Sequence, residues 1–164
     1  MHRASMALLL CVLAAIPFSA RAGECPNCGP EPMQNYPGPA FKLDIRERDG
    51  GFTVYCGGTE DSYEYLHVTP GSFVAWTLDP KSPAPFAVVT FGVSPFDDDV
   101  AVFVVYRGQW TWARVRESIK PDPAAPCGGE NETLFTYAVS GATGGAPRSG
   151  PGVVVCPPGT PNCH

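Results

Sequence analysis

Hydrophobic and polar positions along this chain repeat with the period of β-strands. Apolar and polar residues alternate over 41–46 and 109–116, as expected of strands with one buried face. Two nearly continuous apolar runs, 86–91 and 100–106, are typical of strands covered on both faces. Asp49-Gly50-Gly51 is a hairpin signal between two such segments. No window combines a 3.6-residue period with helix caps, so the pattern predicts strands throughout.

The strand signals recur at short intervals and predict an all-β domain. The nine segments are 41–46, 52–56, 63–68, 73–78, 86–91, 100–106, 109–116, 135–139 and 152–156. About nine short strands without helices indicate a β-sandwich or barrel. The 19 prolines and 18 glycines are spread between the apolar runs, which suits turns better than disorder. We therefore predict a sandwich domain at 41–156, preceded by a Pro/Gly-rich arm at 23–40 and followed by a tail at 157–164.

The first 22 residues predict export. His2 and Arg3 precede the apolar run 7–16, and Ala20-Arg21-Ala22 ends the segment with a small-x-small triplet. The apolar run is too short to cross ~30 Å of hydrocarbon as a helix. We expect a cleaved signal peptide at 1–22, a secreted or periplasmic mature protein, and no integral membrane segment after cleavage.

Charge excludes two classes of partner. The net charge of −5 becomes −7 when the signal, with its two arginines, is removed. An acidic chain without a Lys/Arg cluster does not favour nucleic acid or anionic membranes. The expected partner is a protein or a glycan.

From Tyr65 onward the order of segments resembles the cupredoxin-like sandwich of secreted and periplasmic proteins. Residues 68–76 enter a strand through Pro70-Gly71, and 85–89 look like the family's following stretch. Residues 134–139 and 151–155 resemble its paired last strands. The resemblance implies a Greek-key β-sandwich, and an immunoglobulin-like sandwich remains the alternative because Greek-key families share such patterns.

The copper ligands of that family are missing. A type 1 copper centre needs two imidazoles and a thiolate, usually with an axial Met. Phe86 stands where the resemblance places the first His, and Val139 where it places the Cys. His67 and His164 are the only imidazoles of the mature chain. We expect a cupredoxin-like shape without copper and without another cofactor.

The spacing Cys25-Pro26-Asn27-Cys28 allows three interpretations. Cysteines of an exported domain favour structural disulfides. A zinc site would need further ligands, which Cys156, Cys163 and His164 can supply. A thiol redox pair normally begins a helix, and none is predicted here.

The mature chain has six cysteines, Cys25, Cys28, Cys56, Cys127, Cys156 and Cys163. They allow 15 pairings. Our hypothesis pairs Cys56 with Cys127, and the two N-terminal cysteines with Cys156 and Cys163. Such disulfides would brace the sandwich and fasten both tails to it.

Three further features carry candidate chemistry. Asp97-Asp98-Asp99 offers oxygens to calcium, although three consecutive carboxylates before a strand are more often a solvated turn. His67 lacks a partner motif, so a packed or edge histidine is the favoured reading over a catalytic one. Trp110 and Trp112 face one side of one strand. They form a binding platform for carbohydrate if exposed, but large aromatics usually pack in the core.

The favoured function is a non-enzymatic binding or structural module. The first alternative is a metal-handling protein that uses Cys25, Cys28, Cys156, Cys163 and His164. The second is an enzyme, either a thiol oxidoreductase acting through Cys25 and Cys28 or a hydrolase without a recognised motif. The sequence leaves the partner, the disulfide connectivity, the oligomeric state and the choice between periplasm and exterior open.

Overall fold

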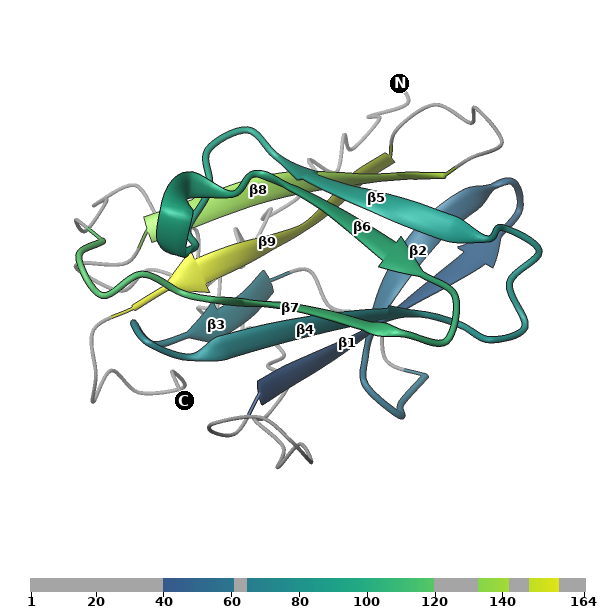
Figure 1. Ribbon diagram of the computed structural model, residues 1–164, viewed down its shortest axis with the longest axis horizontal. Helices are drawn as coiled ribbons and strands as arrows, with labels where there is room; N and C mark the ends of the chain where they lie inside the picture. Colours follow the sequence, from purple (N-terminus) through teal and green to yellow (C-terminus); the bar gives the residue numbers. More distant parts are fainter. Residues whose placement is uncertain (1–39, 61–64, 120–132, 142–147, 157–164) are drawn as a thin grey trace, which may run out of the picture.

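The protein consists of two β-sheets that share one hydrophobic core (Figure 1). The computed structural model describes residues 40–60, 65–119, 133–141 and 148–156. The prediction of an all-β chain with about nine strands is confirmed, and the described residues add only one short 3₁₀ segment. The elements are β1 (Ala40–Arg48), β2 (Gly51–Cys56), β3 (Tyr65–Val68), β4 (Phe73–Leu78), β5 (Phe86–Phe91), η1 (Asp97–Asp99), β6 (Val102–Tyr106), β7 (Trp110–Arg114), β8 (Thr133–Gly141) and β9 (Arg148–Val155).

Both sheets are mixed. The four-stranded sheet has the order β2-β1-β4-β7, and the five-stranded sheet has the order β3-β9-β8-β5-β6. Strand β1 runs parallel to β4, and β3 runs parallel to β9. The other neighbours are antiparallel. The chain crosses between the sheets repeatedly, so each sheet combines segments from both halves of the sequence.

Strand β1 shows how the alternating pattern forms the core. Phe41, Leu43 and Ile45 are buried, while Lys42 and Asp44 on the opposite face are only half-buried. Successive side chains of a strand point to opposite faces, which is why the period of two selects one buried face.

The turn from β1 into β2 confirms the predicted hairpin. Asp49 and Gly50 have φ values of 51° and 71°, and Arg48 pairs with Gly51. Two successive positive φ values are the requirement of a type I′ turn, whose twist matches that of the flanking strands.

Aromatic rings from both sheets meet in the core. Trp76 of β4 is fully buried and stacks on Phe103 of β6 at a centroid distance of 5.2 Å. Phe96 packs edge-on against Trp76 at 5.5 Å, and Phe91 does so at 6.3 Å. These contacts join the two layers.

Strand β6 differs from its prediction. The run 100–106 indicated a strand covered on both faces, yet Val102, Val104 and Tyr106 are exposed while Phe103 and Val105 are buried. The reason is that the fold has two layers, so one face of β6 packs on the core and the other faces outward, and the edge position of β6 leaves this outer face with a neighbouring strand on one side only. An apolar run does not reveal which strand a sheet places at its edge.

The terminal predictions lie outside the described residues. The signal peptide at 1–22, residues 23–39 of the arm and the tail at 157–164 therefore stay predictions. Nowhere in the described ranges is a helix long and apolar enough to cross a membrane.

Candidate functional site

The strongest candidate site lies where the edge strands of the two sheets follow each other along the chain. Strand β6 ends one sheet and β7 ends the other. The chain passes between them through Gly108, which has a φ of 70° and donates its N–H to the Leu78 carbonyl at 2.9 Å. The Thr111 hydroxyl donates to the Val104 carbonyl at 3.0 Å. This tight connection holds both strands on one side of the molecule.

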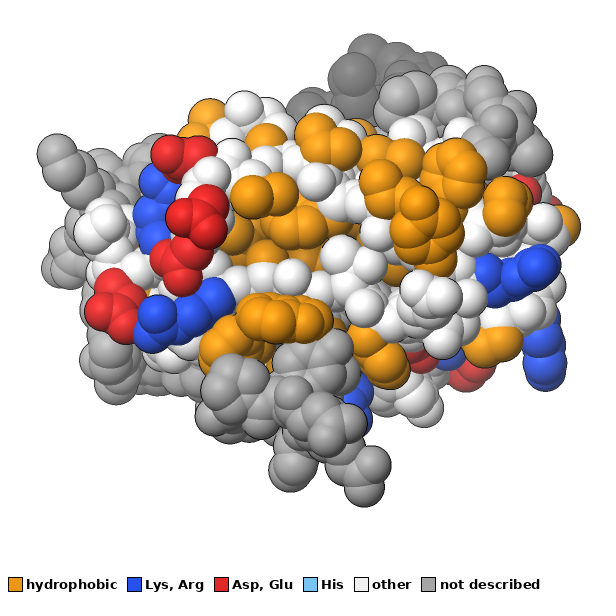
Figure 2. All heavy atoms as spheres, viewed as in Figure 1, with side chains coloured by type: hydrophobic (Ala, Val, Ile, Leu, Met, Phe, Trp, Pro, Cys, Tyr) orange, Lys and Arg blue, Asp and Glu red, His pale blue; other side chains and the backbone are white. Residues whose placement is uncertain are grey.

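Large apolar side chains are exposed on both strands. We call this set the β6–β7 surface, and its members are Val102, Val104, Tyr106, Trp110 and Trp112. Figure 2 shows hydrophobic side chains gathered along this side of the molecule. Concentrated apolar exposure of this kind is typical of interaction sites.

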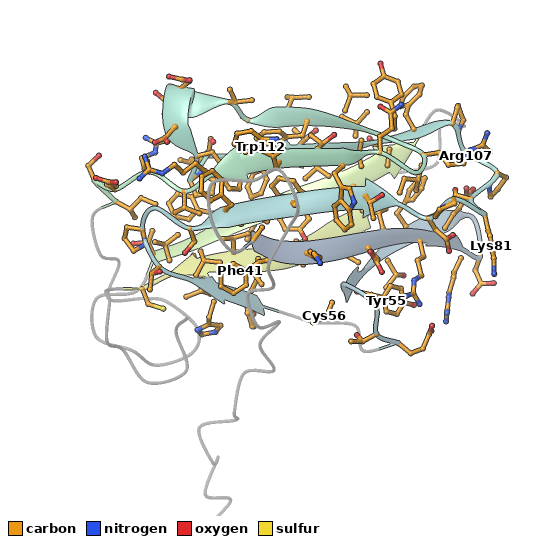
Figure 3. All side chains as sticks on the ribbon, turned by 60° about the horizontal axis from the view of Figure 1, so that its bottom comes forward. Phe41, Tyr55, Cys56, Lys81, Arg107 and Trp112 are labelled. Carbon is orange, nitrogen blue, oxygen red and sulfur yellow. The ribbon has the colours of Figure 1, made fainter. Side chains whose placement is uncertain are left out.

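The two tryptophans are partly exposed and do not pack in the core, although large aromatic side chains usually do. Trp110 is 40% exposed and Trp112 is 46% exposed. They pair with Thr77 and Ala75 of β4, on the outer face of the four-stranded sheet. The Trp112 ring packs edge-on against Phe73 at 5.4 Å, which restricts its orientation (Figure 3 labels Trp112).

A groove of about 430 Å³ opens beside Trp112. Its apolar lining includes Phe73, Phe103 and Trp112, and its charged lining consists of Asp97, Asp98 and Arg114. We call it the Trp112 groove. It brings together two features that the sequence analysis treated separately, the acidic triplet and one of the two tryptophans.

The acidic triplet has a specific local conformation. Asp98 and Asp99 have φ values of 60° and 53°, in the left-handed region that Asp and Asn tolerate better than most residues. The backbone thus turns sharply inside η1, and the carboxylates of Asp97 and Asp99 reach different arginines.

The neighbours of the triplet set the charge of the groove. Asp99 accepts a hydrogen bond from Arg116 at 2.5 Å, and Asp97 lies 3.8 Å from Arg114. Arg114 is engaged more closely by Glu117, at 2.5 Å. Asp98 forms no ion pair with any residue that the structure describes. Its carboxylate is therefore the available charge at the groove.

Metal binding by the triplet receives no support from this geometry. In the described ranges, no group of three or more His, Cys, Asp or Glu side chains is close enough to hold a metal ion. His164, the other metal candidate, lies outside those ranges.

His67 is a buried strand residue. It lies in β3, pairs with Val154 of β9 and is 3% exposed. The favoured interpretation of a packed or edge histidine fits both its burial and the edge position of β3.

Two of the six cysteines fall within the described residues. Cys56 ends β2 and is half-buried against the core (Figure 3). Cys156 follows β9, is buried, and donates its backbone N–H to the Val68 carbonyl at 3.0 Å. Cys25, Cys28, Cys127 and Cys163 lie outside, so the pairing hypothesis and the thiol and metal alternatives stay predictions.

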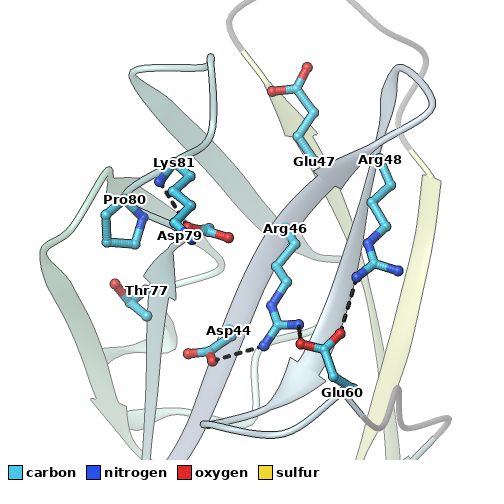
Figure 4. A pocket seen from close by; sticks show the side chains of 9 residues that line it. All are labelled: Asp44, Arg46, Glu47, Arg48, Glu60, Thr77, Asp79, Pro80 and Lys81. Carbon is cyan, nitrogen blue, oxygen red and sulfur yellow. Dashed lines mark hydrogen bonds and ion pairs between the residues drawn. The ribbon is translucent and has the colours of Figure 1, made fainter.

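A second, charged cleft of about 430 Å³ lies on the outer face of β1 (Figure 4). Arg46 binds Glu60 at 2.7 Å and lies 3.6 Å from Asp44. Its guanidinium also stacks over the Tyr55 ring at 4.5 Å. Burial lowers the pKa of Arg46, but the hydrogen bond and charge of Glu60, helped by Asp44, outweigh it, and the net result is a raised pKa.

This cleft is internally neutralised. Arg48 reaches Glu60 from the other side at 3.1 Å, so the charges of Asp44, Arg46, Arg48 and Glu60 balance one another, while Glu47 accepts a hydrogen bond from Ser82 at 3.1 Å (Figure 4). The sequence analysis missed the cluster, although Asp44, Arg46 and Arg48 alternate along β1 and so share one face. We assign it a structural role because little free charge remains for a ligand.

Comparison with known proteins identifies no family for this chain. The sequence matches no protein-family model and no curated protein.

Proposed function

We propose that this chain is an exported, non-enzymatic binding module that recognises a partner through the β6–β7 surface. The observation that carries the proposal is the exposure of Trp110 and Trp112 beside the apolar outer side chains of β6. Burying large aromatic side chains stabilises a monomer, and two of the chain's three tryptophans keep 40% and 46% of their surface exposed, which a partner could cover.

The proposal includes a cupredoxin-like Greek-key sandwich as the scaffold. Immunoglobulin domains consist of two antiparallel sheets. Here each sheet contains a parallel pair, β1 with β4 and β3 with β9. This difference favours the cupredoxin-like over the immunoglobulin-like alternative.

The proposed scaffold lacks copper because other side chains stand at the two positions where the resemblance places the first His and the Cys. Phe86 begins β5, and Val139 of β8 is buried in the core. Neither side chain can bind a metal. His67 lies in β3, three strands away from β5 in the order of the sheet, or roughly 14 Å at ordinary strand spacing. It cannot replace the missing imidazole.

Disulfide bracing belongs to the proposal as well. Cys56 ends β2, and Cys156 directly follows β9. Bridges from these positions would fasten the arm, the 120–132 segment and the tail to the sheets. The intact mass of the exported protein tests this. We expect six alkyl groups to be added after reduction and none before.

Site-specific photo-crosslinking tests the binding role. We would replace Val104 with p-benzoylphenylalanine in the exporting host and irradiate intact cells. A matched probe at Glu60 lies next to β2, at the opposite edge of the four-stranded sheet from β7. We expect a discrete adduct of higher mass from position 104 and none from position 60. Equal adducts at both positions, or none at position 104, would refute the proposal.

A further inference from the structure

We propose that the Trp112 groove binds an arginine side chain from a partner protein. This inference rests on the proposed binding function and names the chemistry that one part of the surface recognises. The groove combines an aromatic wall, an apolar floor and an available carboxylate, which match the three parts of an arginine side chain.

The aromatic wall suits a guanidinium. Arginine is the cation found most often over a tryptophan face, and its planar group also stacks on aromatic rings. Phe73 packs edge-on against Trp112 at 5.4 Å and limits the positions that the indole can take. A ring that is already oriented loses less conformational entropy when a ligand binds.

The apolar part of the groove suits the stem of the same side chain. Phe103 is 7% exposed and belongs to the core, while Val100 and Ala113 complete the lining between the two sheets. Arginine buries its methylene groups along apolar surface while its charged head stays near polar groups. A compact ammonium ion or a metal ion would leave this lining without contacts.

The charge of the groove selects a cation. Asp97 and Asp98 face a single arginine, Arg114, which is engaged by Glu117 at 2.5 Å. Asp98 is exposed and makes no ion pair among the described residues. A carboxylate can accept two parallel N–H donors from one guanidinium. The net charge of −5 on the whole chain favours the approach of a basic partner.

A glycan is the competing occupant, and the groove fits it less well. Sugars present hydroxyl groups all around the ring and need several well-placed donors and acceptors. Three of the lining side chains, Asp97, Asp98 and Arg114, are charged, and the remaining lining is apolar. A protein partner with an exposed arginine makes better use of both parts.

The test uses two peptides that differ in one charge. Acetyl-Val-Arg-Val-amide would be titrated into the mature protein and followed by saturation-transfer NMR, with acetyl-Val-citrulline-Val-amide as the neutral isostere. We expect the citrulline peptide to bind about tenfold more weakly, because a hydrogen bond to a charged group is stronger than one between neutral groups. Binding of the arginine peptide should weaken in 0.5 M salt, since the charged side chains of the groove are exposed.

Matched variants locate the site. Trp112→Ala should abolish binding, whereas Val93→Ala, at a 71% exposed apolar residue outside both the groove and the β6–β7 surface, should retain it. Asp98→Asn should weaken binding about fivefold or more. Asp49→Asn is its control, because Asp49 is also an exposed aspartate with a positive φ. Circular dichroism would verify that each variant is folded.

Three results would overturn the inference: equal binding of the two peptides, no effect of Asp98→Asn, or equal losses from Trp112→Ala and Val93→Ala. Binding of a soluble polysaccharide that depends on Trp112, without arginine-peptide binding, would replace arginine with a glycan. The crosslinking result is independent of these outcomes. An adduct at position 104 without peptide binding would reject only the arginine inference, and peptide binding without an adduct would reject only the broader surface.

Discussion

Trp76 offers the sharpest test of the packing argument because its burial includes an unsatisfied donor. The side chain is 0% exposed and lies among Phe91, Phe96 and Phe103. Its indole Nε1–H has no hydrogen-bond acceptor among the described residues. A buried donor without a partner costs about 1–3 kcal/mol relative to its hydration in the unfolded chain.

The substitution Trp76→Phe separates two opposing effects. It keeps an aromatic ring in the cluster but removes two ring carbons, which costs about 1.5 kcal/mol of transfer free energy. It leaves a cavity of roughly 40 Å³, which adds about 1 kcal/mol at 24 cal/mol per Å³. Removing the unsatisfied N–H raises the free energy of unfolding by about 2 kcal/mol. We therefore expect Trp76→Phe to lower the free energy of unfolding by about 1 kcal/mol or less.

The control variant Trp76→Ala removes the ring altogether. Substitutions of this kind cost about 3–5 kcal/mol, a large fraction of the stability of an ordinary domain. Urea unfolding followed by far-UV circular dichroism would measure both variants on one scale. A cost above about 3 kcal/mol for Trp76→Phe would refute the reasoning, because it would mean that the indole N–H makes a favourable bond.

Fluorescence gives an independent check on the same variant. Trp76 is the buried member of the chain's three tryptophans, and Trp110 and Trp112 are exposed. Emission from Trp76→Phe should shift to longer wavelength and become more accessible to acrylamide, because only the exposed indoles remain. An unchanged spectrum would contradict the assigned burial.

Three other predictions concern stability. A Cβ added in Gly57→Ala would lie 2.6 Å from the Lys42 Cβ and 3.1 Å from its carbonyl oxygen, so unfolding by urea should show a loss of about 1–3 kcal/mol. Gly92→Ala, with nothing within 4 Å of the new atom, is the control and should change stability by less than about 0.5 kcal/mol; equal effects would refute the steric argument. Glu60→Gln should cost no more than about 1 kcal/mol because Glu60 is 77% exposed, and thermal melts at low and high salt would reveal any larger value. Cys56→Ser should remove up to ~4 kcal/mol through loss of its proposed disulfide, and stability equal to that of the oxidised wild type would reject the bridge.

Local pattern was sufficient to predict the strands. The buried set Phe41, Leu43 and Ile45 was visible as an alternation, and Asp49-Gly50 predicted the hairpin that the structure contains. These features depend on neighbours within a few residues, which is why the sequence alone indicates them.

The candidate site could not be predicted from local sequence pattern, because it is formed by contacts between segments that are far apart in the chain. Whether Val104 is buried depends on whether a further layer covers the outer face of β6, and the number of layers is a property of the whole fold. Asp98 and Trp112 meet because β7 pairs with β4 while η1 leads into β6 of the other sheet. The sequence separately suggested an acidic turn and an aromatic pair, but only the crossing between the sheets makes them a groove.

The place of β9 inside its sheet has a consequence for the assembly of the molecule. This strand lies between β8 and β3, and it pairs Tyr65 with Gly152, 87 residues further along the chain. Pairings over such distances form slowly, because the entropy of closing a long loop is lost before the contacts of the pairing are gained. Until the segment of β9 arrives, β3 has no place in its sheet and β8 presents an unpaired edge. A chain with this topology cannot complete its five-stranded sheet until the last strand, β9, has been synthesised.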